Sequence, residues 1–143
     1  MTFSQRVDQA IRNCSQMSFD QLKFHAFRNF NIVYEYYKDI YSSPYYTARE
    51  SLRLYMIFFA ILDGDLDEDE ARIIEYVDES LDYDEIFEIA SNISASSIYS
   101  SYCELVQVLP DYEMTALVEL CTAIMFSDGG LTRGEYDFIK GHV

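Results

Sequence analysis

Apolar residues recur at helical spacing through almost the whole chain, and the alternation that is typical of strands is nearly absent. The pattern predicts an all-α protein, with about seven helices in a compact bundle. The expected helical segments are 4–17, 19–41, 48–62, 68–77, 82–90, a stretch that leads from a serine-rich run to residue 109, then 111–125 and a short last segment within 132–139. No linker separates these segments, so residues 1–143 are predicted to form a single domain.

Helix starts carry a second local signal. Ser18 with Gln21 and Thr47 with Glu50 have the spacing of a capping box, in which two side chains satisfy free backbone N–H groups reciprocally. Asp82 and, after Pro110, Asp111 are further predicted caps. The helix over 48–62 is apolar nearly all round toward its end, which places it in the middle of the bundle.

An acidic turn follows that helix and has a second copy later in the chain. The pattern D-G-x-L-x-x-x-E occurs at 63–70 and again at 128–135, an offset of 128 − 63 = 65 residues. In each copy the glycine suits the end of one helix, because glycine adopts left-handed backbone angles without steric penalty. Asp67 and Thr132 then suit the N-caps of the next helices, with Glu70 and Glu135 completing capping boxes. Each copy is therefore predicted to be a joint between two helices.

The aspartate that opens each copy has no such explanation. Asp63 and Asp128 come at a helix C-terminus, where a negative charge opposes the helix dipole, so a cation is expected nearby. The spacing excludes an EF-hand, because Glu68 and Ile74 stand where that loop needs Gly and Glu. Oxygen ligands of this kind favour a divalent cation such as Ca²⁺, Mg²⁺ or Mn²⁺. The candidate metal ligands are Asp63, Asp67, Glu70, Asp128 and Glu135.

The two copies, LDGDLDEDEARII at 62–74 and SDGGLTRGEYDFI at 127–139, resemble the TerB-like (tellurite-resistance) family, which includes N-terminal regions of some membrane-anchored J-domain co-chaperones. That family has a small residue before each D-G, which Ser127 matches and Leu62 does not. The resemblance covers the chain from about Ser18 onward. It implies an all-helical fold of two related halves, a stress- or defence-linked role alongside other proteins, and a proposed link to metal. It implies no established catalytic reaction.

The charge and composition of the chain limit the classes of partner that it can bind. The net charge of −15 argues against nucleic acid, whose binding needs Lys and Arg, and against anionic membrane surfaces. Cations or basic protein partners fit it better. The longest apolar run, 54–62, is about half the length of a membrane span. Three cysteines without a framework, together with an N-terminus that lacks a signal-peptide pattern, predict a cytoplasmic protein with buried thiols.

Three functions stay open. The first, which we predict over the other two, is a non-catalytic binding or regulatory module. The second is a carboxylate-metal enzyme that uses Asp63, Glu70, Asp128 and Glu135. The third is a structural oligomer whose interface is a tyrosine-rich belt; its members are Tyr34, Tyr36, Tyr37, Tyr41, Tyr45 and Tyr46, although packing in the core explains these side chains as well. His25 is predicted to lie in the core or a groove, and the spacing of His and Cys does not predict a zinc site.

Overall fold

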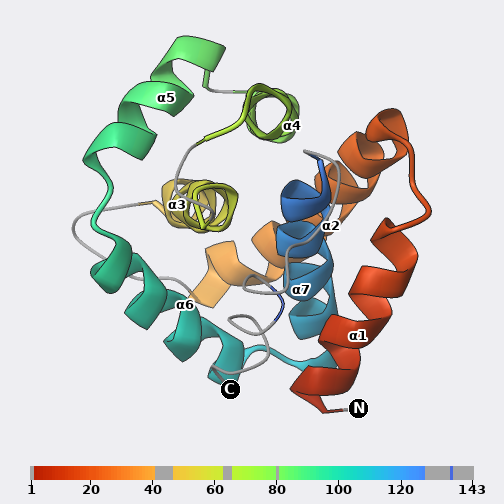
Figure 1. The fold of residues 1–143 in the computed structure, drawn as a ribbon. Helices are drawn as coiled ribbons and strands as arrows, with labels where there is room; N and C mark the ends of the chain where they lie inside the picture. Colours follow the sequence, from red (N-terminus) through yellow and green to blue (C-terminus); the bar gives the residue numbers. More distant parts are fainter. Residues whose placement is uncertain (1, 41–46, 63–65, 80, 128–135, 137–143) are drawn as a thin grey trace.

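The computed structural model describes residues 2–40, 47–62, 66–79, 81–127 and 136. All regular structure in these ranges is helical, which confirms the predicted all-α class (Figure 1). The seven helices of these ranges are α1 (Phe3–Cys14), α2 (Phe19–Ile40), α3 (Ala48–Ala60), α4 (Glu68–Val77), α5 (Tyr83–Asn92), α6 (Ala95–Val108) and α7 (Asp111–Phe126). Apart from Tyr136, the segment expected at 132–139 lies outside the described residues, as does the second D-G joint, so the repeat of two halves stays a prediction.

The predicted caps explain where several helices begin. The Ser18 and Gln21 side chains each bond the other residue's backbone N–H, at 3.2 and 2.8 Å. A reciprocal capping box also joins Thr47 to Glu50. The Asp82 side chain accepts the N–H of Glu85, which confirms the cap of α5.

One predicted cap is wrong. Pro110, not Asp111, occupies the N-cap of α7, and it makes no side-chain cap bond. The Asp111 carboxylate instead accepts a hydrogen bond from Arg6 Nη2 of α1 at 2.9 Å. The Asp111 side chain therefore joins α7 to α1, and it does not cap the start of α7 as its position in the sequence predicted.

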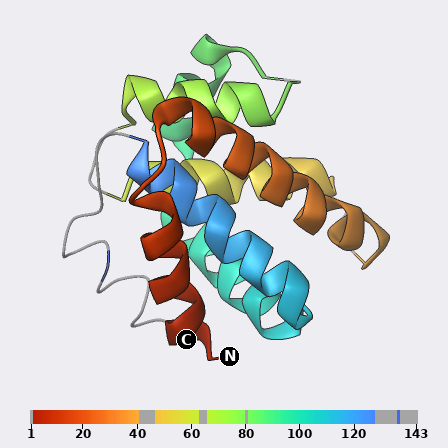
Figure 2. The ribbon, with the colours of Figure 1, turned by 90° about the vertical axis from the view of Figure 1, so that its right-hand side faces the viewer.

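Helix α7 is the centre of the bundle. Every residue from 116 to 125 is buried, and α7 contacts α1, α2, α3 and α4. Figure 2 shows α2 between α4 and α7. Helix α3 is buried over 55–60, as its apolar sequence predicted, and it also contacts α5 and α6, which lie at the edge of the bundle in Figure 1. Helix α7 and the second half of α3 thus form the inside, because their apolar residues leave no polar face to turn toward water.

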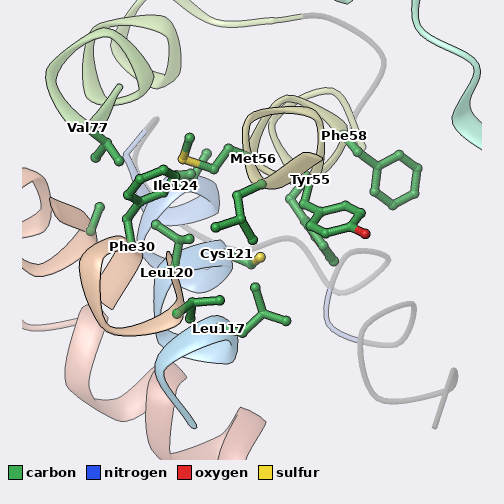
Figure 3. Packing of buried hydrophobic residues seen from close by; sticks show 14 of the residues in the cluster. Phe30, Tyr55, Met56, Phe58, Val77, Leu117, Leu120, Cys121 and Ile124 are labelled. Carbon is green, nitrogen blue, oxygen red and sulfur yellow. The ribbon is translucent and has the colours of Figure 1, made fainter. Parts of the chain in front are cut away.

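The core is filled by large side chains from these two helices and their neighbours (Figure 3). The Tyr102 ring of α6 packs edge-on against Phe59 and Tyr55 of α3, at centroid distances of 4.8 and 5.9 Å. The Tyr55 hydroxyl lies 2.7 Å from Ser101 Oγ, so the polar end of this buried ring has a hydrogen-bond partner. Across the described ranges, none of the helices combines the length and apolarity that crossing a bilayer requires.

A buried ion pair fixes α3 against the end of α4. Asp78, the C-cap residue of α4, is fully buried, and its Oδ2 accepts a hydrogen bond from Arg53 Nε at 2.7 Å. Arg49 Nη1 lies 3.7 Å from Asp78 Oδ1, and its guanidinium also lies 4.5 Å from the centre of the Tyr34 ring. The ion pairs of Asp78 and the contact between Arg49 and Tyr34 therefore join α2, α3 and α4 at one place.

Candidate functional site

The first acidic joint begins α4. Asp67 Oδ1 accepts the N–H of Asp69 at 2.7 Å, and Glu70 Oε1 accepts the N–H of Asp67 at 2.9 Å. Glu70 is buried while Asp67 is exposed. The predicted capping box is confirmed, and both side chains have a structural role as helix caps.

The other three predicted metal ligands, Asp63, Asp128 and Glu135, lie outside the described residues. The structure therefore brings together two of the five candidates, and it does so as caps of one helix. The proposed cation at this joint and the shared carboxylate cleft of the enzyme hypothesis both stay predictions.

A pair of substitutions at Asp67 tests its role as a helix cap in the absence of metal. Asp67→Ala is expected to lower the free energy of unfolding by about 1 kcal/mol, because it removes an N-cap acceptor. Asp67→Asn is expected to keep the stability, since Asn caps a helix as well as Asp does. Urea denaturation in the presence of a chelator measures both. Equal stability of the Ala and Asn variants would contradict the capping role.

A second cluster of potential ligands lies where α1, α2 and α7 meet. Cys14 ends α1, His25 lies in the second turn of α2, and Glu119 lies in the middle of α7. His25 Nε2 is 2.8 Å from Glu119 Oε2, and Cys14 Sγ is 3.9 Å from the same oxygen. One ligand atom from each residue lies within 4.8 Å of the other two. We call these three residues the α1–α2–α7 cluster.

The cluster is shielded from water. Cys14 is 1% exposed and Glu119 6%, whereas the His25 side chain is 19% exposed and forms the open side. Burial, and after it the Glu119 carboxylate, raises the pKa of the Cys14 thiol far above its ordinary value. The exposed Asn13 side chain donates a hydrogen bond to Glu119 Oε1 at 2.8 Å. Within the described ranges, no Lys or Arg forms an ion pair with Glu119.

Helix packing builds this cluster from distant parts of the sequence. Val7, Ala10 and Cys14 share the buried face of α1, which contacts α7. His25 precedes Ala26, which is fully buried in α2, the main partner of α7. Sequence spacing could not find the cluster, because its members are 11 and 94 residues apart and belong to three helices. The only signal in the sequence was a glutamate within the most apolar helix.

A shallow groove of about 350 Å³ lies between α2 and α4. Its lining residues are Phe19, Lys23, Arg72, Glu75, Tyr76 and Glu79. Phe24 and Phe27 flank it with unusual exposure for phenylalanine, 63% and 36%. Both rings pack against Tyr76, at centroid distances of 5.9 and 5.6 Å. We call Phe24, Phe27, Glu75, Tyr76 and Glu79 the α2/α4 surface.

The basic side chains around this groove form ion pairs, whereas two of its acidic side chains form none within the described part of the chain. Lys23 Nζ lies 3.6 Å from Asp20 and 5.2 Å from the centre of the Tyr76 ring. Arg72 Nη2 lies 2.8 Å from Glu68 Oε1. Glu75 and Glu79, by contrast, form no ion pair with any residue that the structure describes. The groove therefore has engaged cations and available carboxylates beside exposed aromatic rings.

The tyrosine-rich belt is partly a feature of the core. Tyr37 is buried, and Tyr34 and Tyr36 are half-buried and packed against the core. The Tyr34 ring stacks on Phe30 at a centroid distance of 6.1 Å. The remaining members, Tyr41, Tyr45 and Tyr46, lie outside the described residues. Three of the six tyrosines thus already have partners within the chain.

Comparison with protein-family models, with curated proteins and with solved structures gave no match to this chain. The resemblance to the TerB-like family therefore rests on the two D-G joints of the sequence.

Proposed function

We propose that this chain is a non-catalytic, cytoplasmic binding module that docks a basic amphipathic helix of a protein partner on its α2/α4 surface. The observation that carries the proposal is the exposure of Phe24 and Phe27 beside two available carboxylates, Glu75 and Glu79. Exposed apolar patches that are rimmed by polar residues are a mark of protein-interaction sites. The resemblance to TerB-like proteins supports a stress- or defence-linked context for such a module.

The spacing of the aromatic residues fits a helical partner. Phe24 and Phe27 are three residues apart in α2, so they lie on the same face of this helix, and both contact Tyr76, which lines the groove. An amphipathic helix presents apolar side chains at i, i+3, i+4 and i+7, which is how helices lie in apolar grooves of other proteins. Burying one Phe side chain fully contributes about 1.5–3 kcal/mol, so two partly buried rings can anchor a weak complex.

Charge selects a basic partner over an acidic one. The chain carries a net charge of −15, and this field accelerates the approach of a cationic segment while it repels an acidic one. Close to the surface, Lys or Arg side chains of the partner meet Glu75 and Glu79. The two cations of the groove, Lys23 and Arg72, already have acidic partners within the chain.

The test uses a labelled synthetic helix of Leu and Lys, with Leu at positions i, i+3, i+4 and i+7, and fluorescence anisotropy. The double variant Phe24→Ser with Phe27→Ser is expected to bind at least tenfold more weakly than the unchanged protein. Tyr112→Ser is the matched control, because Tyr112 is as exposed as Phe24 and lies on α7 away from the groove. Equal binding by the double variant, or equally tight binding of a peptide with Glu in place of Lys, would overturn the proposal.

The acidic joint at 63–70 is the second part of the proposed function. We propose that it takes a hard divalent cation, with Ca²⁺, Mg²⁺ and Mn²⁺ as the candidates. The exposed carboxylates of Asp67 and Asp69 at the start of α4 support this proposal, as does the unexplained Asp63 of the sequence. Calorimetric titration with each ion tests it. The proposal would be wrong if none of the three ions gave a heat of binding or changed the melting temperature.

A further inference from the structure

We propose that the α1–α2–α7 cluster is a zinc site in which Cys14, His25 and Glu119 supply the three protein ligands. Thiolate, imidazole and carboxylate are the side chains that bind Zn²⁺ in proteins. Three such groups from three helices converge on one small volume, with Glu119 Oε2 facing both of the other ligand atoms. This site is separate from the acidic joint and from the α2/α4 surface.

The distances between the ligand atoms fit a small tetrahedral ion. Two N or O ligands about 2.0–2.1 Å from a tetrahedral zinc lie about 3.3 Å apart, and a sulfur ligand lies about 3.6 Å from either. In the structure, Nε2 of His25 is 2.8 Å from Oε2 of Glu119, and Sγ of Cys14 is 3.9 Å from that oxygen. These two separations therefore change by about 0.5 Å or less when the ion binds, and the third, from Cys14 Sγ to the His25 ring, starts within 4.8 Å and must become about 3.6 Å.

A fourth residue holds the carboxylate in the orientation that binding needs. Asn13 Nδ2 donates to Oε1 of Glu119 at 2.8 Å, which leaves Oε2 to face Cys14 and His25. Hydrogen bonds of this kind, from residues that do not touch the metal, fix ligand geometry in metal sites. Asn13 is the residue next to Cys14, so the end of α1 supplies both a ligand and the group that orients a second ligand.

Charge balance favours a doubly charged ion at this place. Glu119 is buried, and its hydrogen-bond partners are Asn13, Cys14 and His25, of which only the His25 imidazole can carry a positive charge. A buried carboxylate is costly unless a cation or strong donors compensate it. When Zn²⁺ binds, the thiol proton passes to water, and the two positive charges meet one thiolate and one carboxylate, so the buried assembly is neutral.

The ligand types select zinc over the hard cations proposed for the acidic joint. Sulfur and imidazole ligands suit Zn²⁺, whereas Ca²⁺ and Mg²⁺ take oxygen ligands almost exclusively. Three protein ligands leave one tetrahedral position for water, on the side of the partly exposed His25 ring. The ion joins the end of α1 to α2 and α7, so zinc is expected to stabilise the attachment of the first helix.

The test is titration of the reduced, metal-free protein with ZnCl₂ against a chromophoric chelator, with CoCl₂ as a spectroscopic substitute. One zinc per chain is expected, together with a thiolate-to-cobalt charge-transfer band. Cys14→Ser is expected to abolish that band, and His25→Gln to weaken zinc binding at least tenfold. Cys103→Ser is the matched control, because Cys103 lies on α6 outside the cluster, and it should retain both signals.

Folding of each variant is checked by circular dichroism before titration. His25→Gln is the decisive variant, because the partly exposed side chain can be replaced with little effect on packing. Zinc should also raise the melting temperature of the unchanged protein and of Cys103→Ser, and not that of His25→Gln. Absence of stoichiometric zinc, or zinc binding by His25→Gln as tight as that of the unchanged protein, would overturn the site in favour of a purely structural bond between His25 and Glu119.

Discussion

Replacing Asp78 with alanine is expected to lower the free energy of unfolding by about 3–5 kcal/mol, because it leaves a guanidinium without its buried partner. Asp78 is fully buried, and Arg53, which donates to it at 2.7 Å, is only 15% exposed. The loss includes the anchoring of α4 against α3, since Asp78 is the residue that ends α4. Urea denaturation followed by circular dichroism measures the change.

Two further variants separate the buried pair from charge in general. Glu68→Ala breaks the exposed pair with Arg72 on the same helix, and the denaturation midpoint is expected to stay unchanged. Asp78→Leu combined with Arg53→Met replaces the two charges of the closest pair by apolar groups, while the 35% exposed Arg49 keeps its access to water, so this variant should recover much of the lost stability. A loss of less than about 1 kcal/mol in Asp78→Ala would mean that the pair behaves like a solvent-exposed one.

The elements of this fold could be predicted because their signals are local. Helix periodicity placed all seven described helices within a few residues of their observed bounds, apart from the serine-rich start of α6. Capping boxes at Ser18, Thr47 and Asp67 depend on residues three positions apart, so spacing alone identifies them. Glu70 could be predicted as a cap for the same reason, because it follows Asp67 by three residues.

Features that depend on which helices pack together could not be predicted in this way. Asp111 accepts a hydrogen bond from Arg6, which is 105 residues away in the sequence, and does not form the expected helix cap. Asp78 accepts a hydrogen bond from Arg53 of the preceding helix, and the spacing of residues around Asp78 does not predict its burial. The α1–α2–α7 cluster is the extreme case, because its three ligand types come from unrelated positions and meet only where α7 packs against α1 and α2.

The central position of α7 also decides where stability is concentrated. Leu120 is fully buried, and Figure 3 shows it among Phe30, Leu117 and Ile124. It lies one residue from Glu119, so the helix presents a core side chain and a candidate metal ligand at adjacent positions. Both positions depend on the same packing of α7 against its neighbours, above all α2.

Leu120→Ala is therefore expected to lower the free energy of unfolding by about 2–5 kcal/mol, through lost transfer energy and the cavity that rigid neighbours leave unfilled. Val108→Ala is the control, because Val108 on α6 is 63% exposed and its loss should change stability by about 0.5 kcal/mol or less. Urea denaturation of both variants measures the difference. Comparable small effects would mean that α7 does not occupy the centre of the bundle. A large effect confined to Leu120→Ala is the result that a central, tightly packed α7 requires.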